Sequence, residues 1–351
     1  MVYTVRSSFP VKIATRHRIV LLLVLLLPLA LLISIKQGTV TTSWTDLFAT
    51  FGLTEHSVDQ TISTILLKLR LPRLLIVAAT GASLALAGAV MQGIFRNALA
   101  DPALLGVSSG GALAVVLILA IGVAPLSWTS EGAFFLPGIA FLGGIIAALF
   151  VYSVARRHDF LDNTVVLLLG IAINALAAAA IGFITFIVND AELRGFIFWM
   201  FGSFADTDWI YLLPIGLLML PSLIFLLCMA RPLNALSLGD EDAVYLGFNT
   251  EHIKKLALLC VVLCVCVSVA IAGIISFVGL IVPHLIRLIV GADHRFLLPA
   301  TAAAGAVFLL IADTFARVVL QPSELPIGIL TALVGVPFFI LLVFKRYSEK
   351  L

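Results

Sequence analysis

Residues 233–255 read LNALSLGDEDAVYLGFNTEHIKK and form the longest polar interruption in the otherwise apolar second half of the chain. Three acids at 240–242 follow Gly239, in a position where the unpaired N–H groups of a helix N-terminus favour negative charge. Gly247 stands about two turns later, where a helix C-terminus commonly needs a positive φ. The stretch therefore predicts a short capped helix with an apolar face at 244–246, suited to a groove on another protein. A solvated interhelical loop is the alternative.

The regions on both sides of this stretch are apolar, as is most of the chain. Hydrophobic residues make up 62% of the 351 positions and charged residues only 11%. Soluble domains carry about 25% charged residues, so this composition excludes a water-soluble globular protein. We expect a single polytopic membrane domain, residues 1–351.

Apolar segments long enough to cross a bilayer recur along the chain. A crossing helix needs about 20 apolar residues, and helices are expected because lipid leaves unpaired backbone groups unsatisfied. The pattern predicts an all-α protein with ten transmembrane helices, at residues 19–35, 65–93, 104–122, 134–155, 164–188, 209–229, 256–272, 275–291, 296–318 and 327–344. Gly273 and Gly279 are expected to break the long apolar run 256–291, and residues 185–208 leave room for an additional interfacial helix.

The basic residues predict the orientation of these spans. An even number of spans places both termini on one side, and a cytoplasmic N-terminus agrees with the positive-inside rule. Only six of the 21 Lys and Arg residues would then face outward, namely Lys36, Lys68, Arg70, Arg73, Arg194 and Arg317. Both termini and residues 233–255 are therefore expected to be cytoplasmic.

Motifs for chemistry are scarce. No G-x-x-x-x-G-K-[ST] phosphate loop and no H-E-x-x-H zinc motif occur, so ATP hydrolysis or zinc catalysis by this chain is not expected. The four cysteines lie in apolar runs without metal-ligand spacing, which predicts buried thiols. Asp313 and Arg317 are spaced i, i+4, which predicts an ion pair on one helix. His284 is either a packing residue or a proton relay.

Several motifs closely resemble the permeases of iron–siderophore, heme and vitamin B12 importers, which are type II ABC importers. They occur in the family's order past residue 60: RLPR at 70–73, GAVMQG at 88–93, RNALADP at 96–102, LGVSSG at 105–110, SFVGLIVPH at 276–284, DHR at 293–295 and ELPIG at 324–328. One departure is Ala98, where the family usually has proline.

The resemblance implies a type II ABC importer permease fold in a homodimer around one central path, in the bacterial inner membrane. Two separate ATPase subunits would bind ATP and Mg²⁺, and a soluble binding protein would deliver the ligand; no stable cofactor and no nucleic acid are expected. The segment 96–110 resembles heme permeases somewhat more than the other branches, so heme or another large iron chelate is the expected ligand. A ferric siderophore or vitamin B12 is the alternative. A secondary transporter is less favoured, because it would need intramembrane carboxylates.

The resemblance also assigns site residues. ATPase coupling is expected at Gly239, Asp240, Glu241, Ala243, Leu246 and Gly247. Docking of the binding protein is expected at Arg70, Arg73 and Arg317, with lipid headgroups as the alternative partner. A cytoplasmic gate is assigned to Asn163 and Thr164, for which helix capping is the simpler explanation. Asn174, on the Ala-rich fifth span, is a candidate for the path lining from its own helix and not from the resemblance.

Overall fold

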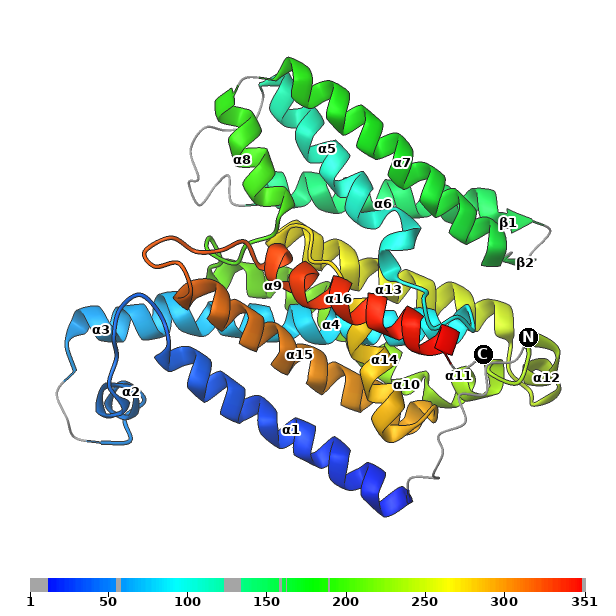
Figure 1. Cartoon of the computed structure of the whole chain (residues 1–351), viewed down its shortest axis with the longest axis horizontal. Coiled ribbons are helices and arrows are strands. Elements are labelled where there is room, and N and C mark those ends of the chain that lie inside the picture. The colour runs from blue at the N-terminus through cyan, green and yellow to red at the C-terminus, as the bar shows by residue number, and fades with distance from the viewer. Residues whose placement is uncertain are drawn as a thin grey trace.

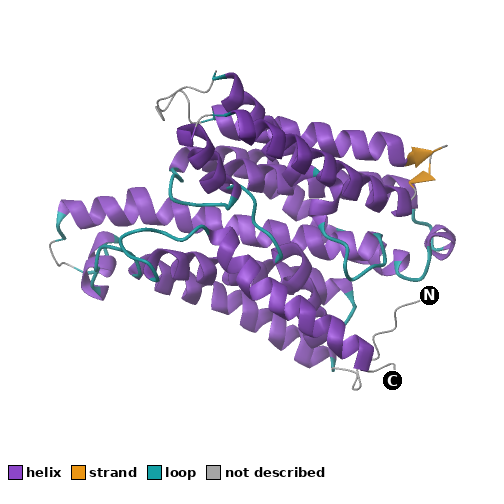
Figure 2. Ribbon diagram, turned by 45° about the horizontal axis from the view of Figure 1, so that its top comes forward, coloured by secondary structure: helices purple, strands orange, loops and turns teal. Residues whose placement is uncertain are grey.

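The computed structural model of the chain describes residues 12–54, 58–122, 134–157, 160–161, 163–188 and 190–348. These residues are almost entirely helical, as Figure 2 shows. The strands within the described ranges are the two-residue β1 (Arg156–Arg157) and β2 (Phe160–Leu161), which pair antiparallel. The expected all-α architecture is therefore confirmed.

Seven helices in the described part of the chain are long and apolar enough to cross a membrane. Five are continuous: α1 (Ile13–Lys36), α6 (Phe135–Ala155), α7 (Asn163–Ile187), α13 (Thr250–Ala272) and α15 (His294–Val318). Two are composite. The first joins α3 (Gln60–Thr64), a π-helical turn (Ile65–Arg70) and α4 (Leu71–Ile94); the second joins a 3-10 turn (Trp209–Tyr211), α9 (Leu212–Pro214), a π-helical turn (Ile215–Met219) and α10 (Leu220–Cys228).

Shorter apolar helices occupy the other three predicted segments: α5 (Val107–Ile121), α14 (Val278–Val290) and the apolar part of α16 (Ile327–Ser348). All ten apolar segments are thus helical, while ten complete crossings stay a prediction. The remaining helices are α2 (Trp44–Thr50), a 3-10 turn (Pro102–Leu105), α8 (Asp190–Met200), α11 (Ala230–Leu236) and α12 (Asp240–Tyr245). The additional helix expected within 185–208 is α8.

The long apolar run 256–291 is broken at one of the two expected glycines. Gly273 has φ +69° and ends α13, and Phe277, with φ +67°, precedes α14. Gly279 lies inside α14 instead of ending a helix, so that part of the expectation is wrong. A Cβ at Gly88 of α4 would lie 1.8 Å from the Gly279 carbonyl oxygen. Because glycine has no side chain, the α4 and α14 backbones can meet at these two residues.

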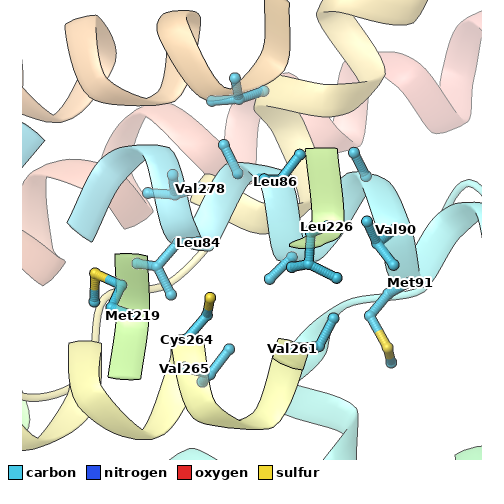
Figure 3. Close-up of a cluster of buried hydrophobic side chains, with 14 of the residues drawn as sticks. Leu84, Leu86, Val90, Met91, Met219, Leu226, Val261, Cys264, Val265 and Val278 are labelled. Atoms are coloured by element: carbon cyan, nitrogen blue, oxygen red, sulfur yellow. The ribbon is translucent and has the colours of Figure 1, made fainter. Parts of the chain in front are cut away.

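Helix α4 forms the centre of the molecule, between α13, α14 and α15 (Figure 1). From Leu84 to Ile94 every residue of α4 is buried. Figure 3 shows Leu84, Leu86, Val90 and Met91 of this helix among side chains from α9–α10, α13 and α14. Lipid is as apolar as these side chains, so close packing and small residues, more than the exclusion of water, hold such helices together.

The elements that carry polar residues gather at two opposite ends of the molecule (Figure 1). One end, called the α12 end below, holds α11, α12, β1 and β2, together with the beginning of α1. The other, called the α2 end, holds α2, α3 and the connection between α15 and α16. Helices α5 to α8 pack as a group beside the α4-centred bundle.

Candidate coupling and docking sites

Helix α12 begins as its sequence predicts. Gly239 precedes it with φ +145°, a conformation that side chains disfavour. The acids at 240–242 occupy the first turn, where they complement the helix dipole. Ala243 is fully buried against the protein, so one side of this short helix is packed and the other is free to face a partner.

The C-terminal end of α12 is closed by a Schellman motif. Gly247 has φ +87°. Its N–H donates to the Val244 carbonyl at 2.9 Å, and the Phe248 N–H donates to the Ala243 carbonyl at 3.0 Å. This pair of bonds satisfies carbonyls that a helix end would otherwise leave unpaired. The predicted capped helix is therefore confirmed, and the solvated-loop alternative is wrong.

The free side of α12 is apolar. Val244 is 57% exposed, Tyr245 89% and Leu246 59%. Large exposed apolar side chains on an otherwise polar surface commonly mark a contact with another protein. Helix α12, which carries this face, lies at the end of the molecule that also holds α11, β1 and β2 (Figure 1).

Ion pairs fasten α12 to the spanning helices. The Lys254 ammonium of α13 lies 2.7 Å from one Asp240 oxygen, and the Arg96 guanidinium, just after α4, lies 3.7 Å from the other. Lys254 is only 8% exposed in its side chain, which makes this the stronger contact. Asp240 thus joins three elements, a role that the dipole argument did not anticipate.

A cavity of about 330 Å³ opens beside this anchor, between α12, the start of α13 and the end of α6. It is lined by Tyr152, Arg156, Asp240, Glu241, Val244, Tyr245, Thr250, Glu251, Lys254 and Lys255. The Arg156 guanidinium lies 3.4 Å from the Glu251 carboxylate across it. Apolar and charged groups of both signs therefore meet on the surface next to the free face of α12.

A cluster of ionic side chains lies at the opposite, α2 end. Asp313 of α15 accepts from Arg73 Nε and Nη2 at 3.1 and 2.8 Å and from Arg317 Nε at 3.0 Å. Glu324 accepts from Arg73 Nη1 and Nη2 at 3.0 and 2.8 Å. Arg317 also donates to the carbonyls of Gln37 and Ser34. The predicted i, i+4 pair between Asp313 and Arg317 is confirmed.

Arg70 is held by backbone instead of by a carboxylate. Its guanidinium donates to the carbonyls of Ile35, Lys36 and Val40 and to the Thr42 hydroxyl. Ile35 and Lys36 end α1, where carbonyl groups lack helical partners, and Val40 and Thr42 follow it. The cluster as a whole therefore holds three arginines and two carboxylates, with Arg70 neutralised by neither.

The three arginines that the sequence analysis assigns to docking are largely buried within the single chain. Arg70, Arg73 and Arg317 are only 7%, 9% and 4% exposed, and each has partners within its own chain. Their burial disfavours the alternative, contact with lipid headgroups. The docking role itself stays a prediction. The pairing was missed because Arg73 lies 240 residues from Asp313 and 251 from Glu324.

The residues assigned to the gate and the path lie on α7. Asn163 begins this helix, and Thr164 is exposed in its first turn; Asp162 lies outside the described residues. Asn174 accepts from the Ser109 hydroxyl at 2.6 Å and donates to the Ala103 carbonyl at 3.3 Å. Asn174 therefore ties α7 to the start of α5 in its own chain, and the gate and path roles stay predictions.

Asp101 is a half-buried carboxylate in the connection between α4 and the 3-10 turn Pro102–Leu105. Asp101 accepts from the Ala103 N–H at 2.8 Å and, with Ser108, Ser268 and Gly279, lines a cavity of about 20 Å³. Asp101 has no second carboxylate among the residues lining that cavity.

Residues 106–110, GVSSG, match the serine-nucleophile pattern G-x-S-x-G in letters. They lead from a 3-10 turn into α5, whereas a nucleophile elbow joins a strand to a helix. Within the ranges that the structure describes, no group of three or more His, Cys, Asp or Glu residues is arranged to hold a metal ion.

Comparison with known proteins agrees with this arrangement. The FecCD transport family model matches residues 24–345. The chain is 42% identical over 341 residues to the hemin transport system permease protein HmuU of Yersinia pestis, covering 97% of this chain and 98% of that protein. It is 38% identical over 330 residues to the vitamin B12 import system permease protein BtuC of Yersinia pseudotuberculosis, covering 93% of each. A solved metal-chelate type ABC transporter in an inward-facing conformation, 34% identical, superposes with a TM-score of 0.80 over 93% of this chain and 99% of its own. This multi-pass membrane protein belongs to the FecCD transport family.

Proposed function

We propose that the chain is the transmembrane permease subunit of an ATP-driven importer that carries heme, or another large iron chelate, into the cytoplasm. The observation that carries the proposal is the match of nearly the whole chain to a hemin permease at 42% identity. The vitamin B12 permeases match at 38%, so cobalamin and ferric siderophores are the competing ligands. The subunit itself is not an enzyme.

Energy would enter through α12. Two copies of a separate ATPase subunit, which hold ATP and Mg²⁺, would bind the exposed face formed by Val244, Tyr245 and Leu246. Gly239, Asp240, Glu241, Ala243 and Gly247 shape and anchor the helix that presents this face. The Lys254–Asp240 pair supports a transfer of movement from α12 to the spans, because the Lys254 side chain is only 8% exposed and has Asp240 as its ionic partner at 2.7 Å. Such transfer suits a rigid-body switch between two arrangements.

The ligand path would form between two copies of the chain, each with ten spans. Ile171, Leu176 and Phe186 of α7 and Leu333 and Leu341 of α16 are exposed in the single chain. These apolar faces are suited to a second copy or to lipid. Asn163 and Thr164 would act at the cytoplasmic gate and Asn174 near the path.

The α2 end would receive a soluble binding protein that delivers the ligand. Arg70, Arg73 and Arg317 outnumber Asp313 and Glu324 in the ionic cluster, and the fork of a guanidinium suits carboxylates on the partner. The α2 end would then face outward from the bacterial inner membrane, with the α12 end and both termini in the cytoplasm.

Reconstitution tests this proposal. The permease and its ATPase, placed in lipid nanodiscs with candidate binding proteins, are supplied with heme, a ferric siderophore or cobalamin, and ATP turnover is measured. Heme is expected to give the largest stimulation. Stimulation by cobalamin or a siderophore alone would assign the chain to those branches, and uptake by the purified permease without an ATPase would refute the proposal.

A further inference from the structure

Glu324 differs from every other member of the ionic cluster at the α2 end. The side chain of Asp313 is 1% exposed and serves two arginines, whereas Glu324 is 29% exposed and serves Arg73 alone. Asp313 lies within α15, while Glu324 lies in the connection between α15 and α16. Of the two carboxylates, Glu324 is the one that solvent and a partner can reach.

Arg73 uses separate sides of its guanidinium for the two carboxylates. Nε and Nη2 point to Asp313, and Nη1 and Nη2 form a fork to both oxygens of Glu324. If Glu324 leaves, Asp313 still neutralises Arg73, and the Nη1 side becomes vacant. The vacant Nη1 and Nη2 donors then suit the two oxygens of another carboxylate, the same group that Glu324 supplied.

The Glu324 pair is also a tether on α16. The next residue, Leu325, donates its N–H to the Ala316 carbonyl of α15 at 3.0 Å. Ile327 and Gly328, the first residues of α16, donate to the carbonyls of Gly202 and Phe201, each at 2.9 Å. The start of α16 is thus held to α15 and to the end of α8 by backbone bonds, and to α4 by the Arg73–Glu324 ion pair.

We infer that Glu324 pairs with Arg73 while no partner is bound, and that a carboxylate of the partner replaces Glu324 on Arg73 during docking. An acidic side chain of the binding protein would replace Glu324 on Arg73, and the departure of Glu324 would free residues 319–326 and the first turn of α16. This inference rests on the proposed function, which supplies the acidic partner. The exchange trades one carboxylate for another, so the net gain on docking is small and binding stays reversible.

The exchange predicts that removing the internal competitor strengthens docking. Glu324→Gln keeps the shape of the side chain and removes its charge. In the permease–ATPase complex in nanodiscs, the variant should bind about fivefold more tightly the soluble binding protein that the wild type captures, as expected for a partly exposed ion pair. Hydrogen–deuterium exchange should become faster at the amides of residues 325, 327 and 328 without any partner present.

Asp59→Asn is the matched control. It removes one negative charge from an exposed residue that caps α3 at the same end, and asparagine caps a helix about as well. If both variants tighten docking equally, general surface charge explains the effect and the exchange is refuted. Should Glu324→Gln fail to assemble, Glu324→Asp shortens the fork by one methylene and should tighten docking in the same direction.

The possible results distinguish a failure of the Glu324 exchange from a failure of the proposed docking role. Unchanged or weaker docking by Glu324→Gln, with a wild-type complex that binds normally, would overturn the exchange and leave the docking site standing. A wild-type complex that captures none of the candidate binding proteins would refute the docking role and the exchange together. Tighter docking with unchanged amide exchange would overturn the release of α16.

Discussion

Asp313 is the residue on which the ionic cluster at the α2 end depends, and Asp313→Asn tests that dependence. The carboxylate is 1% exposed in its side chain and accepts three hydrogen bonds from two arginines. Asparagine has nearly the same shape but no charge, and its NH₂ group would face N–H donors. Leaving buried charges without their partner costs about 3–5 kcal/mol. Glu324→Gln, at a partly exposed pair, should cost about 1 kcal/mol or less.

The free energy of unfolding of the purified protein, measured by denaturant titration in detergent micelles, provides the comparison. Arg317→Gln combined with Asp313→Asn should cost less than the sum of the single changes, by about 1–3 kcal/mol, because the two side chains interact. A loss below about 1 kcal/mol for Asp313→Asn, or one no larger than that for Glu324→Gln, would contradict the assignment of Asp313 as the shared buried anchor.

Three further predictions concern other parts of the chain. Leu246→Glu should abolish stimulation of the ATPase while membrane insertion is unchanged, and Leu246→Met should preserve it; stimulation by both variants would remove α12 from the coupling path. Gly88→Val places a side chain where a Cβ would lie 1.8 Å from the Gly279 carbonyl oxygen, so the yield of folded protein should fall sharply, and a normal yield would contradict the close contact of α4 and α14. Burial raises the pKa of Asp293, but hydrogen bonds from Asn234 and the Arg295 N–H outweigh burial and hold that pKa below its usual range. The stability that this carboxylate contributes is therefore present above about pH 4 and is lost as the pH falls further. Below that pH, the melting temperature should fall more steeply in wild type than in Asp293→Asn. Parallel plots of melting temperature against pH would exclude this contribution of Asp293.

Local signals made α12 predictable. Gly239, the acids at 240–242 and Gly247 act through the backbone of their own helix, and the structure contains the expected caps. The apolar segments were found for the same reason, since length and hydropathy are properties of one stretch of sequence. Helix boundaries were less accurate at the polar beginnings of α1 and α13, which start at Ile13 and Thr250 where the predicted spans start at 19 and 256.

Residues whose roles depend on distant partners could not be placed in this way. Arg73 was treated as a surface cation because charge counting considers only the side of the membrane, whereas Asp313 and Glu324 reach it from the other end of the sequence. Asn174 was assigned to the path from its helix alone, and its bond to Ser109 depends on how α5 and α7 pack.

Gly279 shows the same limit in the packing of the spans. The sequence pattern predicts a helix break at Gly279, but the absence of a side chain there allows α14 to approach Gly88 of α4. A single sequence does not distinguish a glycine that ends a helix from one that lies where two helices touch. The neighbouring Gly273, with its positive φ, does end one.

The contact between α12 and an ATPase subunit is the central claim, and a photo-cross-linker at Tyr245 tests it most directly. The side chain is 89% exposed on the free face of α12. In intact cells that express the whole transporter, irradiation should link this position to the ATPase subunit, and a cross-linker at Leu53, exposed at the α2 end, should not. Linkage of position 245 to the extracytoplasmic binding protein, or labelling of it by a membrane-impermeant reagent added outside the cell, would contradict the account.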